Sequence, residues 1–280
     1  MALIALIFGL ACIILWPVQS DGKTRTYMLD IGQGDSFLIV APNGKKLLID
    51  GGRNASVLTE LSKVMPRGDK TIDVMIATHP DADHIGGLPS VLDRYQIGLF
   101  LTSDVSTDTK TFTALFASLL DHQVPAYYAR HGMALGLAPN TTFSIIFPDR
   151  PTTNWDTNPA SVVGRLDVGP RGNGVSTLFT GDSTSSVEHY LATAIPDELN
   201  VDILKLGHHG SKYSSSTEYL TVTSPSLGLI SAGVNNSYGH PSTDTLARLK
   251  ALNIPWTSTQ DHGIVTITTD GTSWHESDEK

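Results

Sequence analysis

The chain has 280 residues, 40% of them hydrophobic and 17% charged, so it is long enough to bury one large core. This composition excludes a disordered or collagen-like chain, and the single cysteine excludes a disulfide framework and a zinc site built from thiolates. Nineteen basic and 28 acidic residues give a formal net charge of −9. Proteins that hold nucleic acid by a basic surface carry a positive charge instead. Ten histidines remain, and imidazole with carboxylate can bind a transition metal without cysteine.

Residues 1–18 are apolar and contain no charged side chain. A spanning helix needs roughly 20 apolar residues and a secretory signal needs fewer, so residues 1–20 are expected to form a signal peptide or a membrane anchor. No Lys or Arg precedes this segment, and Lys23 and Arg25 follow it, which leaves cleavage and retention both open. We expect residues 21–280 to form one domain that is exported or membrane-anchored on the extracytoplasmic side.

Beyond residue 21 the chain alternates between β-rich runs and short amphipathic helices. Pro42-Asn43-Gly44 predicts a hairpin turn, and Asn54 can cap a helix whose apolar residues follow at helical spacing. The first half is expected to contain strands at Thr26 to Ile31, Ser36 to Ala41, Lys46 to Asp50, Ile72 to Ala77, Ala126 to Tyr128 and Phe143 to Phe147, and helices through 57–64 and Lys110 to Leu120.

The second half begins with a polar surface loop at Asp149 to Asn158. A glycine-rich turn at 169–174 predicts a second hairpin. The expected strands are Ser161 to Leu166, Val175 to Thr180, Val201 to Leu206, Leu227 to Ser231, one around Trp256 and Ile264 to Thr268, and the expected helices are Val187 to Ala194 and Thr243 to Leu252. Mixed sheets with helices outside them predict a layered α/β sandwich.

The segment THPDADHIGG at 78–87 is the densest group of potential ligands, because His79, Asp81, Asp83 and His84 fall within six residues directly after an apolar strand. Alternation along an extended segment would point His79, Asp81 and Asp83 the same way, and a turn at Asp83 would bring in His84. Neighbouring carboxylates repel, so four such groups facing one point require a cation. The alternative is an acidic turn with two incidental histidines, and the density of ligands argues against it.

Three later segments repeat the design of an apolar strand followed by polar side chains. Asp182 follows the strand that ends at Thr180, and His208 and His209 follow the strand that ends at Leu206. His240 lies just before a predicted helix. Each has an ordinary explanation on its own, since Asp182 can cap a helix and the histidines can be turn or surface residues.

Together these segments resemble the metallo-β-lactamase superfamily, and more narrowly the hydrolase domain of ComEC-type DNA-uptake proteins. The matching segments are LDIGQGD at 29–35, LIDGG at 48–52, the His79 motif, FTGD at 179–182, LGHHGS at 206–211 and YGHP at 238–241. The resemblance covers Thr26 to Thr268 and implies an α/β fold, a four-layer αββα sandwich that holds two divalent metal ions at one edge. Phosphorylcholine esterases of Gram-positive surface proteins resemble this pattern as well.

The resemblance also implies a ligand set. The expected metal ligands are His79, Asp81, Asp83, His84, Asp182 as the bridging carboxylate and His208, which could exchange roles with His209. Asp81 stands where the superfamily usually has a second histidine, and its harder carboxylate makes manganese credible beside zinc. No histidine between His84 and Asp182 fits the family's third motif, and Asn158 is the candidate substitute.

The chemistry implied is hydrolysis of a phosphodiester by a metal-bound water. Asp83 or Asp81 would accept the proton of the water, and His240 would contact the phosphate or protonate the leaving oxygen. The residues expected to support the ligands or contact the substrate are Asp50, Asp35, His209, Ser211 and Lys212.

The function expected first is cleavage of DNA outside the cytoplasmic membrane, with a membrane channel as a further partner. The net charge of −9 argues against DNA, although Arg53, Lys205 and Lys212 near the site would offset it locally. Two alternatives stay open, namely a surface hydrolase similar to the phosphorylcholine esterases and a catalytically degenerate module that docks on a membrane. Hydrolysis of β-lactams ranks below these.

Overall fold

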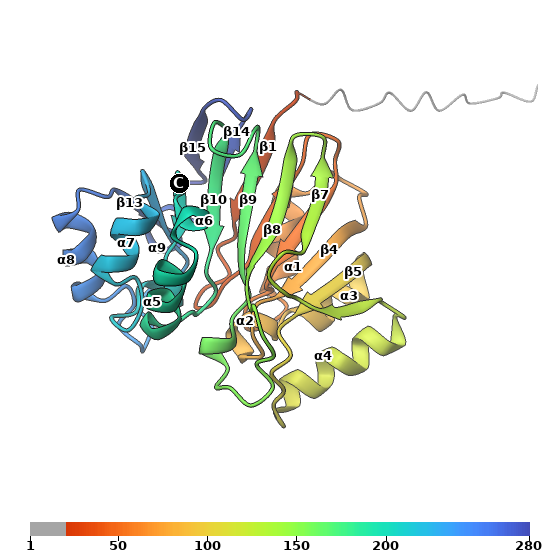
Figure 1. The fold of residues 1–280 in the computed structure, drawn as a ribbon. Helices are drawn as coiled ribbons and strands as arrows, with labels where there is room; N and C mark the ends of the chain where they lie inside the picture. Colours follow the sequence, from red (N-terminus) through yellow and green to blue (C-terminus); the bar gives the residue numbers. More distant parts are fainter. Residues whose placement is uncertain (1–20) are drawn as a thin grey trace, which may run out of the picture.

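The computed structural model describes residues 21–280, so the expected signal peptide or anchor at 1–20 lies outside the described residues. Two β-sheets pack face to face, and helices cover the outer face of each (Figure 1). This arrangement confirms the αββα sandwich expected from the sequence. Within residues 21–280, no helix combines the length and apolarity needed to cross a membrane.

The first sheet is formed largely by the N-terminal half of the chain and is joined by two C-terminal strands. Its strands, in spatial order, are β15 (Trp274–Asp278), β14 (Val265–Thr269), β1 (Thr24–Met28), β2 (Phe37–Val40), β3 (Lys46–Ile49), β4 (Thr71–Ala77), β5 (Gln96–Thr102) and β6 (Ala126–Tyr128). Strands β3 to β6 are parallel, and the pairs from β15 to β3 are antiparallel.

The second sheet also mixes the two kinds of pairing. Its strands, in spatial order, are β13 (Trp256–Ser258), β12 (Leu227–Ile230), β11 (Ile203–Lys205), β10 (Val175–Phe179), β9 (Val163–Val168), β8 (Thr141–Phe147) and β7 (Ala134–Ala138). Strands β10 to β13 are parallel, whereas β7 to β10 are antiparallel.

Helices divide between the two outer faces. Helices α1 (Ser56–Val64), α3 (Leu88–Arg94) and α4 (Lys110–Asp121) cover the first sheet, and α5 (Ser185–Ala194), α7 (Thr217–Thr223) and α8 (Thr243–Ala251) cover the second. Shorter elements are α2 (Ala82–Ile85), α6 (Pro196–Leu199), α9 (Thr259–His262) and the 3₁₀ turns η1 (Asn158–Ala160) and η2 (Gly207–Gly210).

Alternation along the strands builds three apolar layers. In β2 and β3, Ile39 and Leu47 face the core between the sheets, while Leu38 and Leu48 face the helices of the first sheet. The core between the sheets is closed by Phe37 and Phe179, whose ring centroids lie 5.3 Å apart. Both faces of each sheet are therefore covered, as the apolar run at Ile72 to Ala77 predicts.

Most predicted elements are present with boundaries shifted by one or two residues. The hairpin turn is confirmed, with Gly44 donating its N–H to the carbonyl of Ala41. The side chain of Asn54 accepts from the N–H of Ser56, although the residue before the helix is Ala55. The elements that the sequence does not predict include β5, β7, β15 and α7.

The predicted alternation from His79 to Asp83 is wrong, because α2 begins at Ala82 and turns Asp83 away from the direction of Asp81. The idea that Asp182 caps the next helix is also excluded, because α5 is preceded by Thr184. In the first case a turn replaces the extended segment expected after His79, and in the second a turn separates Asp182 from the start of α5.

The topology brings distant segments to one edge of the sandwich. Strands β1, β3 and β4 run in the same direction, so the loop 29–36, Asp50 and His79 follow strand ends at the same edge of the first sheet. In the second sheet the parallel strands β10, β11 and β12 are followed by Asp182, His209 and Ser231. The N–H of Val162 donates to the carbonyl of Thr78 and ties the two sheets together at this edge.

Candidate metal centre

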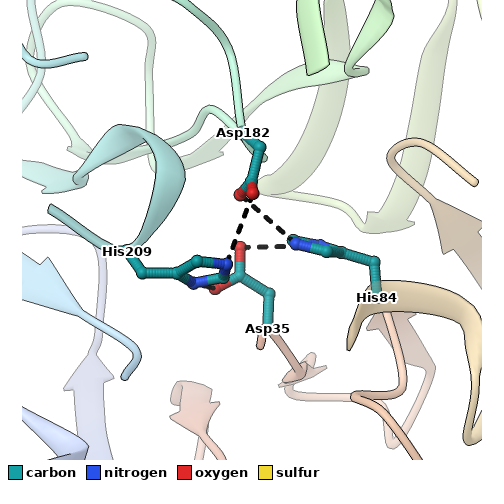
Figure 2. Close-up of side chains that lie close together, drawn as sticks. All are labelled: Asp35, His84, Asp182 and His209. Carbon is teal, nitrogen blue, oxygen red and sulfur yellow. Dashed lines mark ion pairs between the residues drawn. The ribbon is translucent and has the colours of Figure 1, made fainter. Parts of the chain in front are cut away.

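Four side chains from four separate loops converge at this edge. Asp35, His84, Asp182 and His209 each offer one ligand atom, and these atoms lie within 4.8 Å of one another (Figure 2). Asp182 Oδ1 is 3.3 Å from His84 Nε2, and Asp182 Oδ2 is 3.3 Å from His209 Nε2. All four residues are buried, so this is an enclosed site with Asp182 between two imidazoles.

The orientation of His84 is set from behind by Asp50. His84 Nδ1 lies 2.8 Å from Asp50 Oδ2, and the same carboxylate accepts from the N–H and the hydroxyl of Thr78. Because Nδ1 faces this carboxylate, Nε2 is the atom that faces Asp182. Asp50 thus has the supporting position that the sequence suggests.

His209 is held by an unusual backbone. Both His208 and His209 have positive φ, at 48° and 54°, which is sparsely populated for residues with a side chain. This left-handed turn places the ring of His209 inside the protein, where its Nδ1 lies 2.9 Å from the carbonyl of Ser231. The Nε2 atom of His209 is consequently the one that faces Asp182.

Asp35 reaches the site because the loop before it packs closely on α2. A Cβ atom at Gly34, where φ is 128°, would lie 2.0 Å from the carbonyl oxygen of Asp83, so only glycine fits there. The carboxylate of Asp35 pairs with His209 Nδ1 at 3.2 Å and with the ammonium group of Lys205.

Lys205 is a buried cation inside this anionic cluster. Its side chain is 1% exposed, donates to the carbonyl of Gly181 at 2.8 Å and lies 3.8 Å from Asp182 Oδ1. A buried ammonium requires carboxylate and carbonyl partners of this kind. Lys205 therefore fixes Asp35 and the loop that carries Asp182.

Several buried atoms at the site have no hydrogen-bond partner. Among the described residues these include Nε2 of His79, His84 and His209 and Oδ1 of Asp35 and Asp182. Unsatisfied buried polar atoms are costly, and a cluster of imidazole nitrogens and carboxylate oxygens is a donor set that a divalent transition metal ion would satisfy. The residues present fit a metal ion.

A second pair of expected ligands lies beside this group. His79 Nε2 is 3.6 Å from Asp81 Oδ2, and the ring centroid of His79 lies 4.1 Å from that of His84, with the two ring planes tilted by 52°. Asp83 Oδ2 lies 3.8 Å from His209 Nε2 and 3.8 Å from the guanidinium of Arg53. The expected ligands of the His79 motif thus border the cluster of four, with Asp83 on the side of His209.

The remaining predicted residues lie nearer the surface. His208 Nε2 is 3.5 Å from Asp182 Oδ2, and the ring of His240 lies 5.4 Å from that of His208 and stacks on exposed Tyr238. Ser211 is buried, and its hydroxyl accepts from the N–H of Tyr213. Lys212 is exposed, with its ammonium 5.0 Å from the ring of Tyr213.

Burial and neighbouring charges shift the pKa of several groups at the site. Burial disfavours charge on Asp182, but His209 and His84 hold the pKa of Asp182 well below its usual range. Burial lowers the pKa of His209, and the carboxylates of Asp182 and Asp35 more than compensate and raise this pKa to about 9. Burial, with His208 and His209, lowers the pKa of His240 to about 4, so its ring is neutral at pH 7. A metal ion would compete with the protons on the buried rings.

Asp35 contacts the Nδ1 side of His209, which is the supporting position that the sequence predicts for it. The sequence favours His208 over His209 as the ligand. The left-handed turn reverses that preference because it buries His209 and leaves the side chain of His208 27% exposed. For the missing third-motif histidine, the structure shows Asn158 in η1 with a buried Oδ1 that has no hydrogen-bond partner.

Known proteins of related sequence include proteins named for competence and recombination. ComE operon protein 3 of Bacillus subtilis is 28% identical over 92% of this chain and 35% of its own length. Recombination protein 2 of Haemophilus influenzae is 29% identical over 85% of the chain and 28% of its own length. Competence protein ComA of Neisseria gonorrhoeae is 29% identical over 89% of the chain and 31% of its own length. The chain thus spans about a third of the length of these relatives.

Solved structures show the same fold at low identity. The metallo-β-lactamase fold protein YhfI of Bacillus subtilis superposes with a TM-score of 0.57 at 14% identity, over 91% of this chain and 100% of that protein. CmlA, a diiron β-hydroxylase of Streptomyces venezuelae, gives a TM-score of 0.54 at 13% identity, over 86% of this chain and 53% of that protein. The profile of the metallo-β-lactamase superfamily matches residues 29–234, and the chain therefore belongs to the metallo-β-lactamase superfamily.

Proposed function

We propose that this chain is a metal-dependent phosphodiesterase that cleaves DNA. The observation that carries the proposal is the group of buried imidazole Nε2 atoms around Asp182 that have no hydrogen-bond partner, in a chain whose relatives include proteins named for competence and recombination. A phosphodiester needs a site that neutralises charge on the phosphoryl oxygens, and a metal cluster does this.

Two divalent ions, zinc or manganese, are proposed as cofactors. His84, Asp182 and His209 would hold one, with Asp35 behind the ring of His209. His79 and Asp81 with Asp182 as a shared carboxylate would hold the other, with Asp83 or His208 completing the sets. Bound ions of this kind lower the pKa of water and neutralise charge on a phosphoryl oxygen.

The chain's own residues have separate tasks in this proposal. Asp83 lies at the rim of the cluster with one oxygen near His209 and Arg53, where it can accept a proton from a reacting water. His240 lies beside His208, and exposed Lys212 follows His208 by four residues, so both are proposed to contact the substrate phosphate. Asp50 and Lys205 keep His84 and Asp35 in position.

DNA is the proposed substrate, although the chain has a net charge of −9. Long-range repulsion of the substrate is reduced by Arg53 and Lys212 at the rim of the site. We place this activity outside the cytoplasmic membrane, with residues 1–20 as signal or anchor and a membrane channel as a partner.

Incubation of metal-stripped protein with single-stranded DNA and added Mn²⁺ or Zn²⁺ tests the proposal. Cleavage that requires metal and is lost in Asp83→Ala, together with a reduced metal content of that variant, is the expected result. Hydrolysis of a phosphorylcholine ester without DNA cleavage would favour the esterase alternative. Protein that takes up no metal would favour a non-catalytic docking module.

A further inference from the structure

A cavity lies on the flank of the metal centre. It has a volume of about 290 Å³, which is just under the range of about 300–1,000 Å³ typical of small-molecule pockets, so it suits one flat group. The residues that line it are Phe147, Arg150, Trp155, Pro159, Ser186 and Tyr190, with Val187 beneath. We propose that this cavity binds a nucleobase of the DNA strand whose phosphodiester lies in the metal centre, an inference that rests on the proposed function.

Three aromatic rings form the cavity. Phe147 is fully buried, and its ring centroid lies 5.9 Å from that of Trp155 and 6.5 Å from that of Tyr190. Trp155 remains 37% exposed although indole is largely apolar. A buried ring thus supports two rings that are accessible from solvent, and such rings are the stacking surfaces that single-stranded nucleic acid uses.

Arg150 extends this surface. Its guanidinium lies 4.7 Å from the ring centroid of Tyr190, and Asp149 holds the guanidinium through two hydrogen bonds of 2.8 Å. The hydroxyl of Tyr190 donates to the same carboxylate. Asp149, Arg150 and Tyr190 therefore form a fixed unit that presents a planar guanidinium beside an aromatic ring, and both kinds of plane stack with bases.

Both walls of the cavity connect directly to the metal centre. Pro159 belongs to η1, and Thr157, two residues before it, lies close to the carboxylate of Asp81. Ser186 is four residues beyond Asp182, in the first turn of α5. Figure 1 shows the loop between β8 and β9 lying between α2 and α5. A strand bound at the metal centre thus has a stacking site beside it.

A nucleobase fits this cavity better than a quaternary ammonium group, the other ligand that aromatic rings attract. The cation beside Tyr190 is already Arg150, which would repel a second one. The carboxylate of Asp149 is occupied by Arg150 and Tyr190 and is not free to attract an ammonium ligand. A neutral base is not repelled by Arg150 and does not need the carboxylate of Asp149 in order to stack.

The test compares variants of the 280-residue chain on two ligands, a fluorescent single-stranded oligonucleotide and the same oligonucleotide with abasic sugars. Binding is measured by anisotropy, and cleavage is followed with added Mn²⁺ or Zn²⁺. Trp155→Ala is expected to weaken binding of the normal oligonucleotide by roughly 5- to 150-fold and to leave binding of the abasic one unchanged. Trp155→Phe should restore most of the loss. Trp256→Ala is the matched control, because Trp256 is 39% exposed and lies on β13, outside the cavity.

Three results would overturn the inference. If Trp155→Ala binds the normal oligonucleotide as the wild type does while DNA cleavage is intact, the base subsite is refuted and the proposed function stands. If the wild type neither binds nor cleaves the oligonucleotide with any metal, the proposed function fails and the subsite fails with it. If choline displaces the oligonucleotide from the wild type, and choline binding is lost in Trp155→Ala, the cavity is an ammonium site.

Discussion

Replacement of Asp50 by asparagine is expected to weaken metal binding through His84. Asp50 is fully buried and accepts three interactions, from Thr78 N at 2.8 Å, Thr78 Oγ1 at 2.7 Å and His84 Nδ1 at 2.8 Å. An asparagine keeps one acceptor oxygen and turns an NH₂ group toward a donor. The ring of His84 then loses the carboxylate that orients it.

The size of the effect follows from the loss of that carboxylate. Removal of such a partner of a ligating histidine lowers metal affinity by about 10- to 100-fold. This corresponds to about 1.4 to 2.7 kcal/mol of binding free energy. The folded state also loses one charge-assisted hydrogen bond, at a cost of about 1.5 to 3 kcal/mol.

Asp202→Asn is a matched control for that structural cost. Asp202 Oδ2 accepts from the N–H of Ser176 at 2.8 Å and from its hydroxyl at 3.0 Å, as Asp50 does from Thr78, but no histidine is involved. Metal affinity is measured by competition with a chromophoric chelator, and stability by thermal unfolding. The reasoning is refuted if Asp50→Asn retains the affinity of the wild type, or if both variants lose affinity equally.

Three further outcomes are expected. Gly34→Ala should weaken metal binding, because its Cβ would lie 2.0 Å from the carbonyl oxygen of Asp83. Gly32→Ala is the control, because no atom lies within 4 Å of a Cβ at this residue, where φ is 79°, and it should retain metal binding in the same titration. At a metal concentration of 100 times the Kd, added Zn²⁺ or Mn²⁺ should raise the unfolding free energy of the metal-stripped wild type by about 2.7 kcal/mol and raise its melting temperature. An equal rise in the melting temperature of Asp182→Ala would contradict the proposed site. Burial raises the pKa of Glu188 to about 7, whereas the bonds from Ser216 and Ser215 oppose the shift. The stabilising contribution of Glu188 is therefore complete below pH 4.5 and is lost as the pH rises through 7, by at most about 3.4 kcal/mol. Urea unfolding at pH 5 and pH 8 should show most of this loss in the wild type and little of it in Glu188→Gln.

The sequence predicts the layered fold because its strands have clear signals. Leu38 and Ile39, or Leu47 and Leu48, alternate between two apolar layers, and a glycine turn separates the two strands. Strand β5 and helix α7 were missed for the opposite reason. Gly98 interrupts the apolar run of β5, and α7 is a seven-residue helix that begins after a run of serines.

The sequence identifies the chemistry of the site better than its geometry. The motif at His79 to His84 and the lone Asp182 stand out because each follows an apolar strand. The choice between His208 and His209 depends on two residues with positive φ, which the pattern Gly-His-His-Gly permits but does not specify. The place of Asp35 depends on the contact between Gly34 and the backbone of Asp83, which joins segments 49 residues apart and has no local signal.

The charge of the site supports the two metal ions that we propose. Five carboxylates gather there, from Asp35, Asp50, Asp81, Asp83 and Asp182, with two cations beside them, the buried ammonium of Lys205 and the guanidinium of Arg53. Metal binding displaces the protons of the imidazoles, so three negative charges remain to be balanced. A single divalent ion would leave one of them facing a phosphodiester, which is itself an anion. A second divalent ion would turn this excess into one positive charge, so that a phosphate gains from the cations.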